Sequence, residues 1–313
     1  MRTSTVPHSP VPIPHSPVVL TGVLPVDKPV GPTSHDAVAH VRRALRTRQV
    51  GHTGTLDPFA SGLLLVCVGQ ATRVAEYLTG LPKAYAATLR LGEATDTDDL
   101  TGEVVGGSAS WRDLTVEAVE AALLRQVGTI QQLPPTYSAK KVDGERMYAV
   151  ARRGGAVERK PVTVTIHEIR VTRIEFPDVD FEVVCGSGTY IRAIARDAGE
   201  ALGTGAHLRA LRRTRVGAHG IERAVPLDAL ADEDRVRAAM LTPLEALADL
   251  PRVPVDAAGE AALGFGRAIP APADAPEGVP LALAGADGRL LAIGERAGDA
   301  IKPRKVFPAE VAG

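Results

Sequence analysis

The chain has few cysteines and few aromatic residues. Two cysteines, Cys67 and Cys185, occur among 313 residues, and both lie in apolar segments. Two isolated cysteines exclude a disulfide framework and a cysteine-based metal cluster, and they are typical of core packing in a reducing compartment. We therefore expect no metal site built on cysteine.

Long hydrophobic segments are also absent. No apolar run approaches the roughly 18 residues needed to cross a bilayer, and the first residues lack the continuous apolar segment of a secretory signal peptide. The hydrophobic content of 45% and the charged content of 23% are ordinary for a globular protein. These features predict a cytoplasmic protein without membrane contact.

The formal net charge is only -1, with 36 basic and 37 acidic residues. Non-specific affinity for nucleic acid comes chiefly from neutralising phosphates, so this balance argues against a protein that coats nucleic acid indiscriminately. The basic residues gather in three places instead. These are Arg42, Arg43, Arg46 and Arg48; the segment from Lys140 to Lys160; and Arg209, Arg212, Arg213 and Arg215. Such patches suit the recognition of one RNA shape, although each alone is more often a solvated helix face.

Composition divides the chain into three parts. Residues 1–20 contain Pro-His-Ser-Pro-Val twice, which predicts a disordered or polyproline-like tail. Residues 21–250 predict one large domain, with a basic, proline-containing insertion at about 130–160. Residues 251–313, rich in Pro, Ala and Gly, predict a small β-rich domain.

Apolar periodicity in the large domain predicts an α/β (α+β) fold. Residues 22–26, 63–69 and 83–91 have strand patterns, and 163–176 with 180–185 predict a strand pair. Helices are expected from Ser34 as N-cap and over 70–80, 114–126 and 190–202, with a helix pair in 226–250.

The segment Gly51-His52-Thr53-Gly54-Thr55-Leu56-Asp57-Pro58 precedes an apolar strand and displays one carboxylate, Asp57, on an irregular loop. Asp57 alone is compatible with a simple turn-closing role. A phosphate-binding P-loop is excluded because the required lysine is missing, and a dinucleotide fingerprint is excluded because the loop precedes a strand.

This segment resembles the catalytic motif of the TruB family of tRNA pseudouridine synthases. Four more segments resemble that family in the same order, so that the similarity covers roughly residues 22 to 216. They are Val26-Asp27-Lys28-Pro29, Lys83-Ala84-Tyr85, the run from Gln132 to Gly144, and Gly188-Thr189-Tyr190-Ile191-Arg192 followed by Gly205-Ala206-His207-Leu208.

The resemblance implies a role for each matching residue. Asp57 corresponds to the nucleophile, Arg192 to its cationic partner, and Tyr85 to the aromatic residue that stacks on the uracil. Without the resemblance, Arg192 would more often be a surface residue and Tyr85 a core residue. The remaining matches imply contacts with RNA or support of the site. They are His52, Tyr190, Leu211, Lys28, Lys140 and Lys141.

A further acidic segment, Asp96-Thr97-Asp98-Asp99, fails the EF-hand pattern because Leu100 occupies a ligand position. We expect a structured acidic turn there. The TruB family has a similar Thr-Asp-Thr-x-Asp segment.

The resemblance implies isomerisation of uridine 55 in the T arm of tRNA, with base flipping and without a metal or cofactor. It further implies a mixed, largely antiparallel sheet, a PUA-like C-terminal domain, and a monomer without an obligatory protein partner. Attack of Asp57 at C1′, attack at C6, and glycal formation are all compatible with the sequence.

An alternative function from a different class of protein is that of an RNA-binding, tRNA-folding chaperone that acts without catalysis. An Asp-dependent hydrolase lacks a second carboxylate or a His/Ser partner in suitable context, and the long basic extensions expected of a guide-RNA-dependent relative are missing.

Overall fold

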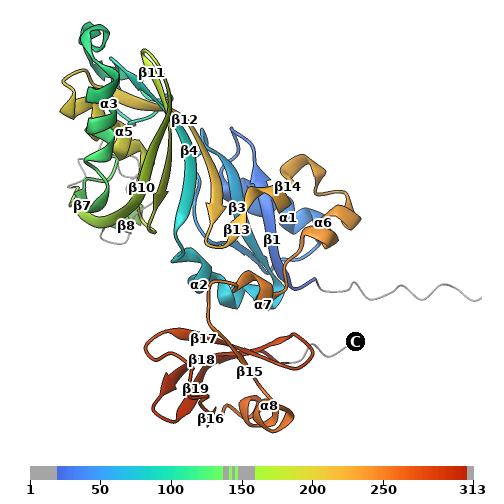
Figure 1. Cartoon of the computed structure of the whole chain (residues 1–313). Coiled ribbons are helices and arrows are strands. Elements are labelled where there is room, and N and C mark those ends of the chain that lie inside the picture. The colour runs from blue at the N-terminus through green and yellow to red at the C-terminus, as the bar shows by residue number, and fades with distance from the viewer. Residues whose placement is uncertain (1–19, 137–140, 143–144, 147–158, 309–313) are drawn as a thin grey trace, which may run out of the picture.

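The computed structural model describes residues 20–136, 141–142, 145–146 and 159–308. Residues 1–19 of the predicted proline-rich tail, and Lys140, therefore lie outside the described residues. A ten-stranded sheet forms the larger part of the molecule, and a separate five-stranded sheet lies at the C-terminal end (Figure 1).

The large sheet is mixed and largely antiparallel, as predicted. Its strands are β1 (Gly22–Lys28), β2 (Val50–His52), β3 (Ser61–Val68), β4 (Lys83–Leu91), β7 (Gly128–Gln132), β10 (Val162–Glu175), β11 (Asp178–Cys185), β12 (Ala206–Val216), β13 (His219–Gly220) and β14 (Val225–Pro226). The order is β14-β1-β3-β12-β4-β11-β10-β7, with β2 on β3 and β13 on β12. Only the β1–β14 and β3–β12 pairs of this described sheet are parallel.

Helices cover both halves of this sheet. The α-helices are α1 (Ser34–Ala44), α2 (Ala75–Thr79), α3 (Val116–Leu124), α5 (Ile191–Ala201), α6 (Glu233–Ala239), α7 (Pro243–Ala246) and α8 (Ala257–Gly264), and the 3-10 helices are η1 (Gly69–Val74), η2 (Ala109–Asp113), η3 (Ile221–Arg223) and η4 (Leu227–Ala229). In Figure 1, α3 and α5 lie on the half that contains β10 and β11, whereas α1 and α6 lie beside β1 and β14. Two small hairpins are added by β5 (Ala94–Thr95) with β6 (Val104–Gly106), and by β8 (Lys141–Val142) with β9 (Glu145–Arg146).

The alternation predicted for residues 83–91 is confirmed in β4. Tyr85, Ala87, Leu89 and Leu91 are all buried, and they belong to one core cluster with Ile194 of α5. The residues between them are only partly buried, because they lie on the opposite face of the sheet.

The apolar run of β3 is buried from Gly62 to Val68 because both of its faces are covered. Leu64 and Val66 share a cluster with Val38 of α1, whereas Leu63 and Leu65 share another with Leu78 of α2. The Asp57 loop therefore enters a strand that is packed on both sides.

β12 was not predicted as a strand, since its four arginines have the composition of a basic patch. It pairs with β4 from Ala206 to Val216, but with β3 only at Arg212 and Arg213. The alternative of a solvated helix face is wrong for this segment, because it forms a strand in which Arg213 is buried and Arg212 forms an ion pair with Asp27.

Three predicted boundaries need correction. Thr33, and not Ser34, is the N-cap of α1, because its side chain forms a capping box with Asp36. The helix expected over 70–80 is split into η1 and α2. Ile130–Gln132 belong to β7 at the sheet edge, where they pair with β10, and so they are not part of an insertion.

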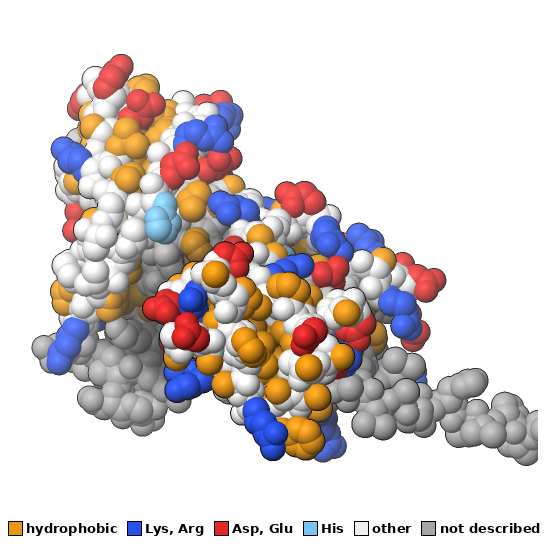
Figure 2. All heavy atoms as spheres, turned by 60° about the horizontal axis from the view of Figure 1, so that its bottom comes forward, with side chains coloured by type: hydrophobic (Ala, Val, Ile, Leu, Met, Phe, Trp, Pro, Cys, Tyr) orange, Lys and Arg blue, Asp and Glu red, His pale blue; other side chains and the backbone are white. Residues whose placement is uncertain are grey.

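The C-terminal end is β-rich, as predicted. Its strands are β15 (Arg252–Pro254), β16 (Ile269–Pro270), β17 (Pro280–Ala284), β18 (Leu290–Ala297) and β19 (Ala300–Val306). Figure 2 shows acidic and basic side chains interspersed with hydrophobic ones on the visible face of this part. Ile293 and Phe307 share a core cluster with Leu78 of α2, and Arg73 of η1 lies over the Phe307 ring at 4.8 Å. The small sheet is therefore packed against the large domain.

Within the described part of the chain, no helix has the length and hydropathy needed to span a membrane.

Candidate active site

The Asp57 loop joins β2 to β3 and is tied to the start of α1. The Ser34 hydroxyl accepts a hydrogen bond from the Leu56 N–H at 2.8 Å and donates one to the Leu56 carbonyl at 3.1 Å. The Gly31 N–H donates to the Pro58 carbonyl at 2.8 Å, and the Ala60 N–H donates to the Asp57 carbonyl at 3.1 Å. Because both sides of Asp57 are anchored, its carboxylate has a defined direction.

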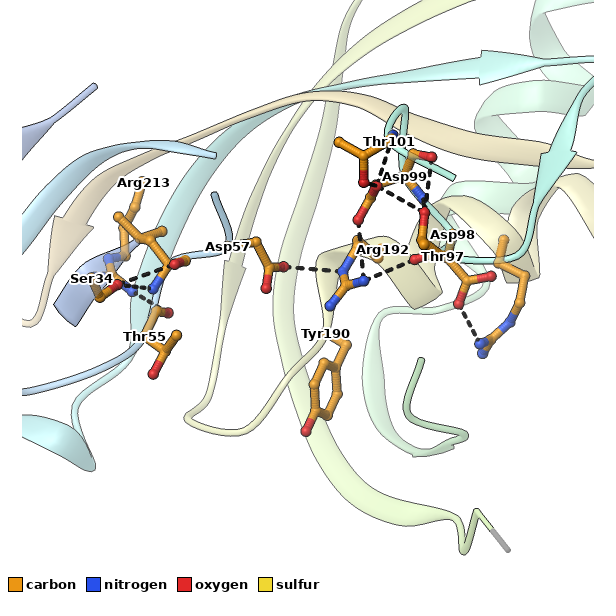
Figure 3. Close-up of polar contacts among 12 residues, drawn as sticks. Ser34, Thr55, Asp57, Thr97, Asp98, Asp99, Thr101, Tyr190, Arg192 and Arg213 are labelled. Carbon is orange, nitrogen blue, oxygen red and sulfur yellow. Dashed lines mark hydrogen bonds and ion pairs between the residues drawn. The ribbon is translucent and has the colours of Figure 1, made fainter. Parts of the chain in front are cut away.

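That direction is toward Arg192 in the first turn of α5 (Figure 3). The distance from Arg192 Nε to Asp57 Oδ2 is 3.0 Å. The Arg192 side chain is 5% exposed and that of Asp57 is 36% exposed. The Asp57 carboxylate is therefore mostly buried but partly accessible from solvent, whereas Arg192 is enclosed by protein.

Arg192 is itself held by the acidic turn predicted at 96–99. Its Nη1 donates to the Asp99 Oδ2 at 3.1 Å and to the Thr97 carbonyl at 2.8 Å. Asp99 Oδ1 accepts hydrogen bonds from the hydroxyl and the N–H of Thr101 at 2.5 and 2.9 Å. The turn thus fixes the guanidinium in the orientation in which Nε faces Asp57 (Figure 3).

Electrostatics at Asp57 reflect this arrangement. Burial raises the pKa of the Asp57 carboxyl above its ordinary value, the Arg192 guanidinium acts in the opposite direction, and the Asp99 carboxylate adds to the increase. The protein has therefore placed a carboxyl group with a raised pKa beside the cation that favours its ionised form. Such perturbed groups are typical of functional sites.

We expect Asp99→Asn to lower the rate of the reaction at Asp57 by about tenfold, since Arg192 would lose a charged partner worth ~1.5 kcal/mol or more. The same change should shift the acidic limb of the rate profile to lower pH, because Asp99 raises the pKa of Asp57. Single-turnover rates measured across pH would test both effects. An unchanged rate and an unchanged limb would contradict the role given to Asp99.

A cavity of about 230 Å³ opens beside Asp57 and Arg192. Tyr85, Leu211 and Tyr190 line it together with these two residues, as do Lys83 and Arg213. The structure therefore brings together residues from β4, α5, β12 and the Asp57 loop. Five of the nine residues predicted for the site, Asp57, Arg192, Tyr85, Leu211 and Tyr190, line one hollow.

The two tyrosines of the cavity are held differently. Tyr85 is 8% exposed, and burial raises the pKa of its hydroxyl, against the effect of the Arg213 charge. Tyr190 precedes α5 and is fixed through its main chain, because its N–H donates to Gln132 Oε1 at 2.8 Å and its carbonyl accepts from Gln132 Nε2 at 3.1 Å. Gln132 of β7 thus helps to position the helix that carries Arg192.

Lys28 and His52 do not line the cavity. Lys28 is 0% exposed and donates to the carbonyls of Pro29 and Pro32, both at 2.8 Å. Burial lowers the pKa of Lys28 to about 8, although the Asp57 carboxylate opposes this shift.

His52 Nδ1 accepts a hydrogen bond from the Gly54 N–H at 3.2 Å, and the His52 ring contacts the His35 ring edge-on, with 5.5 Å between the ring centroids.

Two predicted residues cannot be placed. Lys140 lies outside the described residues, and nothing is described of the side chain of Lys141, which belongs to β8. Conversely, Asp99, Lys83 and Arg213 were not predicted as site residues. Asp99 was noticed only as part of an acidic turn, and Lys83 only as context for Tyr85. Within the described ranges, no cluster of three or more His, Cys, Asp or Glu side chains has metal-site geometry.

Two family descriptions match consecutive parts of the chain. The TruB family pseudouridylate synthase N-terminal domain matches residues 42–191. The tRNA pseudouridylate synthase B C-terminal domain matches residues 192–249. The chain is also 45% identical to tRNA pseudouridine synthase B of Burkholderia lata over 294 residues, which are 92% of this chain and 90% of that protein. This chain belongs to the TruB family.

Further relatives of this TruB-family protein extend over almost the same length. tRNA pseudouridine synthase B of Arthrobacter sp. (strain FB24) is 46% identical over 301 residues, 92% of this chain and 97% of that protein. Among solved structures, a Cbf5-Nop10-Gar1 complex matches with a TM-score of 0.74 and 30% identity, covering 93% of this chain and 86% of that one. An H/ACA RNP bound to a substrate RNA containing 2'-deoxyuridine matches with a TM-score of 0.73 and 28% identity, covering 93% and 87%.

Proposed function

We propose that this TruB-family protein isomerises uridine to pseudouridine at position 55 in the T arm of tRNA. The observation that carries the proposal is the Asp57–Arg192 pair at 3.0 Å, beside a cavity that Tyr85 and Leu211 also line. The relatives named tRNA pseudouridine synthase B supply the reaction and the class of RNA.

The reaction conserves all atoms of the nucleotide. The bond from ribose C1′ to uracil N1 breaks, the base turns within the site, and a bond from C1′ to C5 forms, while the proton on C5 is lost and N1 gains one. Asp57 acts on the sugar or the base in its ionised form, and Arg192 favours that form and directs it. Attack at C1′, attack at C6 and glycal formation all use the same carboxylate.

Tyr85 and Leu211 are proposed to enclose the uracil during this turn. Tyr85 provides an aromatic wall and a hydroxyl that relays the C5 proton, passing its own proton to solvent as it accepts that one, and Leu211 lines another part of the base pocket. Tyr190 and Lys28 support the site, and His52 stacks beside the flipped nucleotide. Removing a base from its stack costs a few kcal/mol, which these contacts offset.

The RNA is proposed to be held by the segment at about 130–160, including Lys140 and Lys141, and by the small C-terminal domain at 251–313. Recognition of this kind uses the shape of the RNA and its unstacked bases more than duplex sequence. The proposal includes a cytoplasmic protein that acts as a monomer without an obligatory protein partner.

We expect the rate to fall as the pH is lowered through the pKa of Asp57. Because that pKa is raised in the folded protein, the acidic limb should lie above the ordinary aspartate value of 3.8. The ionised form is the active one, so activity is present above the limb and lost below it. Single-turnover rates over a pH series would check this, with tRNA binding measured at each pH. A rate that stays constant down to the ordinary value would contradict the assignment.

Two unmodified tRNA transcripts test the proposed function, one natural and one with cytidine at position 55. We expect one pseudouridine per molecule in the first transcript and none in the second, with equal binding of both. Binding of both without any conversion would favour a tRNA-folding chaperone instead. Equal conversion of both would contradict the proposed position.

A further inference from the structure

Arg213 on β12 is a buried arginine whose side chain contacts main-chain oxygens of the Asp57 loop. It is 2% exposed. Its Nε donates to the Leu63 carbonyl at 2.7 Å, its Nη2 to the Gly54 carbonyl at 3.1 Å, and its Nη1 to the Thr55 carbonyl at 3.4 Å. One guanidinium thus contacts the loop two and three residues before Asp57 and the strand after it.

Arg213 also lies beside Tyr85, the second group proposed to act on the base. Arg213 and Tyr85 are directly opposed in the antiparallel β12–β4 pair, so their side chains are neighbours on one face. The Arg213 charge also lowers the pKa of the Tyr85 hydroxyl, against the larger effect of burial. Both residues line the cavity beside Asp57. Figure 3 shows Arg213 beside Thr55, on the side of Asp57 that is opposite to Arg192.

The charge of Arg213 is costly at this place. Within the described residues, no carboxylate lies within ion-pair distance of its guanidinium, in contrast to Arg192 with Asp57 and Asp99. The Arg213 charge also opposes the protonated forms of the buried amines of Lys28 and Lys83. A cation that is buried without a carboxylate normally destabilises a fold. A hydrophobic side chain would avoid that cost but would leave the carbonyls of Leu63, Gly54 and Thr55 without these donors. The charge of Arg213 is therefore used to hold the main chain of the Asp57 loop.

The backbone around Arg213 leaves little room for adjustment. A Cβ atom at Gly62 would lie 2.3 Å from the Arg213 carbonyl oxygen, and Gly62 has a φ of +108°. β3 and β12 therefore approach as closely as a glycine allows. The guanidinium is held in place at the point where the two strands meet.

We propose that Arg213 is a positioning residue that fixes Asp57 and Tyr85 relative to one another. The planar guanidinium donates to three carbonyls, those of Leu63, Gly54 and Thr55, and lies directly across the strand pair from Tyr85; a lysine ammonium cannot reproduce this arrangement. This inference rests on the proposed function, since it assigns Arg213 to the alignment of the same two groups. A misplacement of about 1 Å at reacting groups lowers rates by roughly 100-fold.

Arg213→Lys tests this role, with Arg90→Lys as the matched control. Arg90 lies on the neighbouring strand β4 and pairs with Asp178 at 3.2 Å, away from the cavity. Arg213→Lys should lower the single-turnover rate about 100-fold while the dissociation constant for tRNA stays within about twofold of wild type. Arg90→Lys should keep both quantities within about twofold of wild type.

Chemical rescue separates positioning from a purely structural role. Millimolar guanidinium or methylguanidinium, far below denaturing concentrations, should restore part of the rate of Arg213→Ala without changing the rate of wild type. If Arg213→Ala fails to fold, Arg213→Lys alone decides the question. An unchanged rate in Arg213→Lys would overturn the inference, as would a rate loss that follows a loss of tRNA binding. A wild-type protein that forms no pseudouridine would instead overturn the proposed function.

Discussion

Replacing Asp57 with asparagine is expected to lower the single-turnover rate of pseudouridine formation by at least about 10⁴-fold, as the loss of a nucleophile does in other enzymes. A carboxamide has nearly the shape of the carboxylate but cannot act as an anionic nucleophile or accept a proton in its place. The change should leave the fold intact, because burial already raises the pKa of Asp57 toward its neutral form. The affinity for tRNA should change little.

Asp113→Asn is a suitable control for this substitution, since Asp113 is an exposed residue of η2. Rates would be measured with enzyme in excess over an unmodified transcript, and melting temperatures would be recorded for both variants. Asp113→Asn should retain the wild-type rate. An Asp57→Asn protein that converts tRNA at a comparable rate would show that the carboxylate is not the reacting group.

Replacing Arg192 with lysine is expected to lower the rate by about 10²- to 10³-fold, the range for removal of a preorganised donor, ~2.7–4 kcal/mol. In the wild type, two different nitrogens of Arg192 serve Asp57 and Asp99, at 3.0 and 3.1 Å. One ammonium group cannot occupy both positions, so either the direction of Asp57 or the anchor at Asp99 is lost. Lysine retains the charge, and tRNA binding should therefore be preserved.

Arg192→Met should have an additional effect on stability. It would leave Asp99, whose side chain is 5% exposed, as a buried carboxylate without its cation, at a cost of ~3–5 kcal/mol in the free energy of unfolding. Denaturant unfolding of the two variants would separate this effect from the loss of rate. Arg192→Lys with a wild-type rate would contradict the geometry proposed for the pair.

Arg196→Lys provides the matched control for Arg192→Lys. Arg196 lies one turn further along α5, forms an ion pair with Asp98 at 2.9 Å and donates to the Leu133 carbonyl at 2.9 Å. It does not line the cavity. A small change in rate for Arg196→Lys beside a large one for Arg192→Lys would show that the contact with Asp57 matters, and not the loss of any ion-paired arginine of α5.

Local sequence patterns predicted much of the sheet and its helices. The strict alternation in 83–91 and the paired patterns at 163–176 and 180–185 correspond to β4, β10 and β11, because each strand has one face on the α5 side of the core. The helix that carries Arg192 was also predicted, with its start just after Gly188 and Thr189. The Asp57 loop was noticed because it combines glycines, a proline and a following apolar strand, and Asp57 was assigned its role through the resemblance to the TruB family motif.

The parts that were missed depend on contacts distant in sequence. β12 escaped prediction because Arg213 occupies a buried position where an apolar residue is expected. The partner of Arg192 in the acidic turn is 93 residues away, and Gly54 is 159 residues from Arg213. Serine is a common N-cap residue, but the Ser34 hydroxyl is hydrogen-bonded to the main chain of Leu56. Thr33 caps α1 instead. Patterns of neighbouring residues in the sequence do not predict these contacts.

The measurement that tests the central claim most directly is a nucleotide-by-nucleotide map of pseudouridine in an unmodified elongator tRNA after one turnover with the wild-type protein. We predict conversion of the T-arm uridine at position 55 and of no other uridine. A bound and released tRNA with every uridine unchanged would contradict the account.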